Sequence, residues 1–133
     1  MRQYNVGKSI SSHMDEIFFM ETKKETIISL EYLAGLIEGE GCLDFISSKK
    51  YKYPQIRVAL KESDSKVLFL IKDIYGGRIN HRGKQKSWKD YWSEQDLWTI
   101  GGEKANKLLK RLLPYLVVKK QKAEILLSEG KQY

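Results

Sequence analysis

The stretch "EYLAGLIEGEGCLDF", residues 31–45, decides the fold, because a helical pattern changes within it into a strand pattern. Apolar residues recur at helical spacing at Leu30, just before the stretch, and at Leu33, Leu36 and Ile37 in its first half. Gly39 and Gly41 then favour the end of that helix, and residues 42–47 have the composition of a strand. The sequence therefore predicts a helix whose last carboxylate, Glu40, lies directly before a strand.

Helical and strand patterns alternate along the rest of the chain. Thr26 or Ser29 is suited to cap the first helix, and Asp64 is suited to cap the second, which closes at two glycines. The other predicted elements are a basic turn over 48–54, a strand over 55–60, strands over 78–82 and 91–100 around the loop "GKQKSWKD", and helices over 103–112 and about 120–127. This order predicts an α+β domain with a four-stranded antiparallel sheet.

Composition narrows the function classes. The chain has 133 residues, a net charge of +7 and a pI near 9.4, which favours a polyanionic partner such as nucleic acid. No apolar run predicts a signal peptide or a membrane span. The single cysteine fits an intracellular, reducing compartment, either an organelle such as a chloroplast or mitochondrion or a prokaryotic or phage cytoplasm. We expect a mobile arm over residues 1–25 and one folded domain over residues 26–133.

The segment "LAGLIEGEG", residues 33–41, resembles the motif that names the LAGLIDADG homing endonucleases, and the predicted αββαββα order is that family's order. The resemblance implies a saddle-shaped sheet with helices on one face. It also implies site-specific cleavage of double-stranded DNA at a long pseudo-palindromic target, leaving short 3′ overhangs. Because only one copy of the motif is present, the implied active form is a homodimer.

The resemblance also implies the catalytic residues. Glu40 occupies the family's metal-binding acidic position, and the main-chain oxygen of Gly39 is the second expected ligand, for Mg²⁺ or alternatively Mn²⁺. The family's polar strand-end position falls on Glu62, with its neighbour Lys61 as the alternative. Lys119 matches the family's lysine before the last helix and is suited to stabilising developing negative charge.

The same resemblance places two surfaces on the chain. The expected dimer interface is the small-residue face of the first helix, formed by Leu33, Ala34, Gly35, Ile37 and Gly39. The expected DNA contacts are the polar positions of the strands and the nearby basic residues: Asp44, Ile46, Ser48, Lys50, Gln55, Arg57, Asn80, Arg82, Lys84, Lys86 and Lys120. No small-molecule substrate and no membrane partner is implied.

Two other functions compete with the endonuclease. A protein of the same fold could act as an RNA maturase or bind DNA without cutting it, since Glu40 replaces the more usual aspartate. A basic α+β interaction module would be a monomer without affinity for duplex DNA. Among single residues, we interpret Cys42 as a small buried apolar residue, Trp98 as a packing residue and His81 as a surface or DNA contact rather than a metal ligand.

Overall fold

Helices and strands follow one another as the sequence predicts. A computed structural model of the chain describes residues 28–83 and 94–133. Its elements are α2 (Leu30–Glu40), β1 (Gly41–Ser47), β2 (Lys52–Lys61), the 3-10 helix η1 (Glu62–Asp64), α3 (Lys66–Tyr75), β3 (Arg78–Arg82), β4 (Gln95–Gly101), α4 (Glu103–Leu112), the 3-10 helix η2 (Leu113–Tyr115) and α5 (Lys120–Glu129). The expected arm, and the loop residues Lys84 and Lys86, lie outside the described residues.

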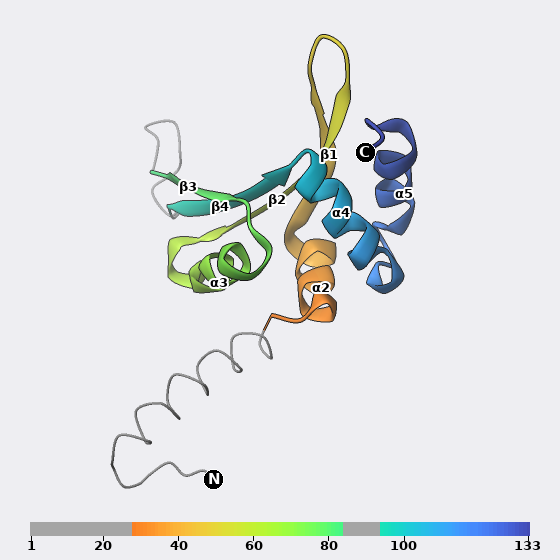
Figure 1. Ribbon diagram of the computed structural model, residues 1–133. Helices are drawn as coiled ribbons and strands as arrows, with labels where there is room; N and C mark the ends of the chain where they lie inside the picture. The colour runs from red at the N-terminus through yellow and green to blue at the C-terminus, as the bar shows by residue number, and fades with distance from the viewer. Residues whose placement is uncertain (1–27, 84–93) are drawn as a thin grey trace, which may run out of the picture.

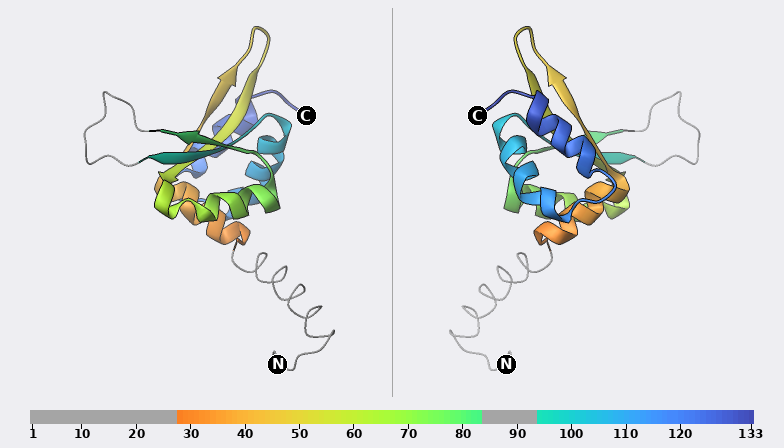
Figure 2. Two further views of the ribbon diagram at one scale, coloured as in Figure 1. Left: turned by 90° about the vertical axis from the view of Figure 1, so that its left-hand side faces the viewer. Right: turned by 90° about the vertical axis from the view of Figure 1, so that its right-hand side faces the viewer.

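The four strands form one antiparallel sheet in the order β1-β2-β4-β3. In Figure 1 the described helices lie below and to the right of this sheet, and none covers the side that faces the upper left. Figure 2 shows how the β1–β2 hairpin rises beyond the helices while β3 and β4 extend sideways. We call the uncovered side the open face. The predicted α+β fold is confirmed.

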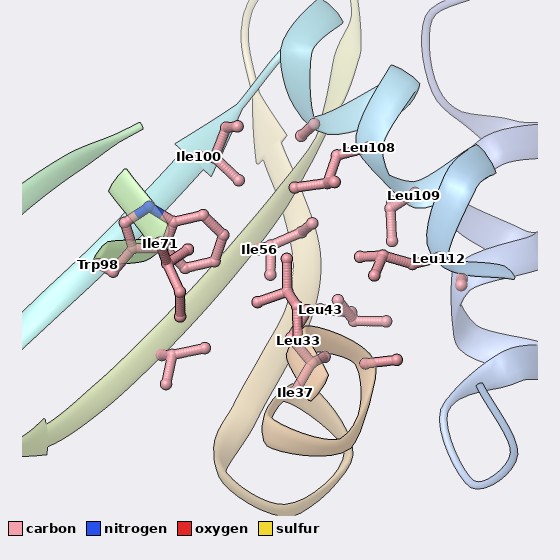
Figure 3. Packing of buried hydrophobic residues seen from close by; sticks show 14 of the residues in the cluster. Leu33, Ile37, Leu43, Ile56, Ile71, Trp98, Ile100, Leu108, Leu109 and Leu112 are labelled. Carbon is pink, nitrogen blue, oxygen red and sulfur yellow. The ribbon is translucent and has the colours of Figure 1, made fainter. Parts of the chain in front are cut away.

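Alternation along the strands assigns each side chain to one face. Ile56 and Val58 of β2 are fully buried, and their neighbours across the ladders are Leu43 of β1 and Trp98 of β4. These side chains meet the helices in the core. Figure 3 shows Leu43, Ile56 and Trp98 there, together with Leu33, Ile37 and Leu109. The residues between them point to the opposite side. They are the residues of the open face: Cys42, Asp44 and Ile46 on β1, Tyr53, Gln55, Arg57, Ala59 and Lys61 on β2, Gln95, Leu97 and Thr99 on β4, and Arg78, Asn80 and Arg82 on β3.

Trp98 anchors the half of the core under α3. Its indole is fully buried, and its Nε1–H donates to the carbonyl of Gly76 over 2.9 Å. Gly77 follows with a φ of +94°, and a Cβ there would lie 2.6 Å from Trp98 Nε1. A glycine is therefore required both by the backbone conformation and by the close approach of the indole. The sequence interpretation of Trp98 as a packing residue is confirmed.

Three predicted boundaries are wrong, and one of them is the start of the fourth strand, which is Gln95 rather than residue 91. β2 begins at Lys52, so the turn is shorter than expected and Pro54 lies inside a strand. The proline is tolerated because β4 pairs with β2 only from Gln55 onward, which leaves Pro54 paired with β1 alone. The residue before α3 is Ser65, whereas Asp64 ends the preceding 3-10 helix.

Within residues 28–83 and 94–133, no helix is long and apolar enough to cross a membrane.

Candidate nucleic-acid interface and catalytic end of the first helix

The last turn of α2 presents two carboxylates that have different surroundings. Glu38 accepts hydrogen bonds from three successive backbone N–H groups, of Val117, Val118 and Lys119, over 3.1, 3.1 and 2.8 Å. These bonds, led by that of Lys119, lower the pKa of Glu38. Glu40 is exposed and makes no polar contact with other described residues. Glu40 is therefore the carboxylate at this helix end that is free to bind a ligand.

Lys119 is fixed to the same helix end from the other direction. Its Nζ donates to the carbonyl oxygen of Glu38 over 2.7 Å, while its backbone N–H donates to the carboxylate of Glu38. An ammonium group suits the carbonyl end of a helix, where the dipole is negative. The ammonium group of Lys119 is therefore held at the carbonyl of the residue two positions before Glu40. The contact between Glu38 and this lysine is not predictable from local sequence, because the two residues are 81 positions apart.

The strand-end alternatives separate onto different sides of the molecule. Lys61 is the last residue of β2, lies opposite Gln95 and belongs to the open face. Glu62 begins the 3-10 helix, and its carboxylate lies 3.6 Å from Nδ1 of His81, away from the ladder position that Lys61 occupies. Of the two, Lys61 has the placement expected for a group facing bound DNA.

The open face carries most of the described DNA-contact candidates. Asp44, Ile46, Gln55, Arg57, Asn80 and Arg82 all have their ladder positions on it. Ser48 and Lys50 lie in the turn between β1 and β2, where the Ser48 hydroxyl donates to the carbonyl of Tyr51 and shapes the turn. Lys120 is the first residue of α5 and belongs to the helical layer rather than to the open face.

A polar cluster of three residues occupies the β1–β2 part of the open face. Arg57 forms an ion pair with Asp44, and its Nη2 also lies 3.5 Å from Sγ of Cys42. The pair joins diagonal neighbours across the ladder, since Arg57 lies directly opposite Cys42. Cys42 is therefore exposed and polar in its contacts. The interpretation of Cys42 as a buried apolar residue is wrong, because the strand begins at Gly41 and turns position 42 outward.

The expected dimer residues divide between two sides of α2. Leu33, Ala34 and Ile37 are at most 1% exposed and pack in the chain's own core, so their side chains are not available to a second chain. Gly35 and Gly39 are exposed, and a Cβ at either position would meet nothing within 4 Å. Tyr32, at 47% exposure, lies on the same side one turn earlier. We call Tyr32, Gly35 and Gly39 the glycine face of α2.

His81 lies among carboxylates rather than on the open face. Its cross-strand neighbour is Asp96, whose Oδ1 is 2.8 Å from His81 Nδ1, and Glu94 Oε1 is 2.6 Å from Nε2. These bonds, first that of Asp96, raise the pKa of His81. The Ser65 hydroxyl and His81 together lower the pKa of Asp96. His81 is exposed, as its interpretation as a surface residue expects, and strand pairing brings it to Asp96, which is 15 positions away in the sequence.

Two oxygen donors at the end of α2 match the needs of a hard cation. The Glu40 carboxylate is unpartnered among the described residues, and the carbonyl of Gly39 belongs to the last turn, where helix carbonyls lack intrahelical partners. Mg²⁺ prefers such oxygen ligands and retains several waters. The residues present therefore fit the metal that the sequence implies.

Comparisons with known proteins agree with this arrangement. The sequence profile described as "LAGLIDADG endonuclease" matches residues 33–122. No curated protein sequence matches the chain. Among solved structures, the homing endonuclease I-CvuI in complex with its target in the presence of calcium has a TM-score of 0.59 and 21% identity, over 80% of this chain and 66% of that one.

A second structure, the LAGLIDADG meganuclease I-AabMI bound to uncleaved DNA, has a TM-score of 0.55 and 28% identity. That match covers 74% of this chain and 35% of the meganuclease, so the chain spans about a third of its length. The likeness to I-CvuI shows the same fold, and the family profile matches well over half of the chain. The chain belongs to the LAGLIDADG endonuclease family.

Proposed function

We propose that this protein is a site-specific, metal-dependent DNA endonuclease that acts as a homodimer. The observation that carries the proposal is the end of α2, where Glu40 has no partner among the described residues and the glycine face is open. Lys119 is held at Glu38, two residues before Glu40. Family membership supports nuclease chemistry. The solved relatives I-CvuI and I-AabMI are DNA complexes, which supports duplex DNA as the substrate.

Each residue at this end has a distinct task in phosphodiester hydrolysis. Glu40 and the carbonyl of Gly39 would hold Mg²⁺, which when bound activates water and neutralises charge on the phosphate. A structure of I-CvuI with DNA in the presence of magnesium supports this choice of ion. Lys119 provides a positive charge whose position is fixed before DNA binds, so it can stabilise negative charge that develops at the scissile phosphate. Lys61 lies on the open face at the end of β2 and would take the strand-end role in preference to Glu62, whose carboxylate faces His81.

The open face would lie against the major groove. Its arginines and polar side chains can read base edges there, and the lysines of the β1–β2 turn can contact phosphates. A twofold dimer places two such faces side by side, which matches a pseudo-palindromic target.

The glycine face supplies the argument for a dimer. Gly35 and Gly39 remove side-chain bulk from a helix surface that no described part of the chain covers, so the backbone of a second α2 can approach closely. Such an approach brings two Glu40 residues to the same region, one for each strand of the duplex. Self-association would therefore bring the catalytic ends of the two chains together, one for each strand.

The test is sequencing of the DNA ends produced when the purified protein and Mg²⁺ are mixed with a pool of partly randomised duplexes. Wild-type protein should cut staggered ends at one related sequence, and Glu40→Gln should bind that sequence without cutting it. Glu124→Gln, another exposed glutamate placed on α5, is the matched control and should cut normally. Full cutting by Glu40→Gln would refute the assignment of the metal ligand.

The same assay separates the strand-end alternatives and the second candidate function. Lys61→Met should slow cutting, whereas Glu62→Gln should leave it near the wild-type rate. Retention of duplex or structured RNA without cutting by the wild type would favour a binding protein or maturase of the same fold. The replacement of aspartate by glutamate at position 40 is the feature that favours this second candidate.

A further inference from the structure

Three carboxylates surround His81 at the β3 edge of the sheet, apart from the end of α2. Asp96 Oδ1 lies 2.8 Å from Nδ1 and Glu94 Oε1 lies 2.6 Å from Nε2. Glu62 Oε2 lies 3.6 Å from Nδ1. The imidazole therefore has an acidic group at each ring nitrogen and a third beside it.

Backbone pairing holds these residues in place. The N–H of Glu62 donates to the carbonyl of Glu94 over 2.9 Å, which ties η1 to the residue before β4. His81 and Asp96 face each other across the β3–β4 ladder. Asp96 is itself fixed, because the Ser65 hydroxyl donates to its Oδ2 over 2.6 Å. The arrangement follows from strand register and not from flexible side chains alone.

The charges of this group do not balance. Among the described residues, His81 is the basic side chain within ion-pair distance of these carboxylates, and even when protonated it leaves two negative charges in excess. Two glutamates that are tied together through their backbones repel each other unless a cation lies between them. A divalent cation that replaced the proton on Nε2 would reduce the excess to one negative charge.

We propose that Glu62, His81 and Glu94 form a binding site for a transition-metal cation of the Zn²⁺ type. One ligand atom from each of the three residues lies within 4.8 Å of those of the other two. The exposed Glu62 carboxylate, whose Oε2 lies 3.6 Å from Nδ1, would rotate toward Nε2 to complete the site. Asp96 accepts the Nδ1 proton and thereby presents Nε2 to the metal, which is the common way a carboxylate orients a histidine ligand. One nitrogen and two carboxylate oxygens suit Zn²⁺, with water in the fourth position, better than they suit Mg²⁺.

The site would join three segments, η1, the edge strand β3 and the residue before β4. An edge strand pairs on one side only, so a metal that bridges it to η1 would protect it from opening. The proposed role is structural, and it is independent of cleavage at Glu40.

The experiment is calorimetric titration of the full chain, without DNA, with Zn²⁺. Wild-type protein should bind one Zn²⁺ per chain and release a proton from Nε2 to the buffer, so the apparent enthalpy should change with the ionisation enthalpy of the buffer. His81→Gln and Glu94→Gln should each weaken binding about tenfold or more. Because these side chains are 45% and 48% exposed, neither substitution disturbs the core, which circular dichroism would verify.

Two controls locate the site. The chain has two histidines, and His13→Gln should bind Zn²⁺ as the wild type does. Glu40→Gln should also retain binding, which separates this site from the catalytic end. The proposal is overturned if the wild type does not bind Zn²⁺, if His81→Gln binds it unchanged, or if Glu40→Gln loses it.

Discussion

Replacing Gly35 by alanine should have opposite effects on the folded chain and on its self-association. Gly35 lies in the middle of α2, and a Cβ there meets nothing within 4 Å. In a helix interior alanine is favoured over glycine by about 1 kcal/mol. The single chain should therefore become more stable, with a rise in melting temperature of about 4 °C for a domain of this size.

The same methyl group should weaken the dimer. If two α2 helices pack closely at Gly35, each added methyl overpacks the contact at a cost of about 1–3 kcal/mol. Twofold symmetry places the methyl on both chains, so the total is about 2 kcal/mol at the least. This corresponds to a dissociation constant raised about 30-fold or more.

The two effects need separate assays, because dimerisation itself stabilises the folded state. Urea unfolding is measured at concentrations where sedimentation shows the wild type to be a monomer, and self-association is measured at higher concentrations. Ser128→Ala in α5 is the control, since it improves helix propensity at an exposed site away from the glycine face. A destabilised monomer would show that the chain itself covers Gly35, and unchanged self-association would refute this face as the interface.

Three further substitutions test the other contacts. Glu38→Gln should reduce the cutting rate more than DNA affinity in single-turnover and binding assays, because it weakens the acceptor that holds residues 117–119 and so Lys119. The raised pKa of His81 means that its bonds stabilise the fold at acidic pH, and that this contribution is lost as pH rises through the folded-state pKa above 6.5. With a chelator present, the difference in urea midpoint between wild type and His81→Gln should therefore shrink toward alkaline pH, and a constant difference would contradict this. Asp44→Asn should strengthen binding to random duplexes by removing negative charge from the open face, while reducing selectivity in a randomised pool, because Arg57 loses its ion pair.

Local sequence signals predicted the elements because those elements follow local rules. The apolar spacing up to Ile37, the glycines at 76 and 77 and the alternation in β2 each act within a few residues, and the structure has the corresponding helix, helix end and strand. The turn was predicted to extend to Pro54 because proline usually interrupts a strand. Proline is excluded from a strand only where a neighbouring strand would need its missing N–H as a donor. The position of Pro54 beyond the end of β4 is a property of the assembled sheet.

The contacts of the candidate site depend on the pairing register of the strands, which cannot be determined from a single sequence. Cys42 has the composition of a core residue, and only the start of β1 at Gly41 turns it toward Arg57. The group around His81 draws on four separate positions between residues 62 and 96. The intervals between these four residues in the sequence do not match a known site motif, because each residue is brought to the group by a different strand pairing or turn.

The two carboxylates of the motif differ in their contacts, which is what the proposed division between a structural and a catalytic residue requires. Glu38 and Glu40 are two residues apart on a helix, so they point to different sides. Glu38 is occupied by three backbone N–H groups and fixes the lysine that precedes α5, while Glu40 has no partner among the described residues. A catalytic carboxylate must keep its oxygens available for a metal, and a structural one must not. The sequence alone gives both residues the same charge and neighbourhood, and the division of roles follows from the contacts of residues 117–119.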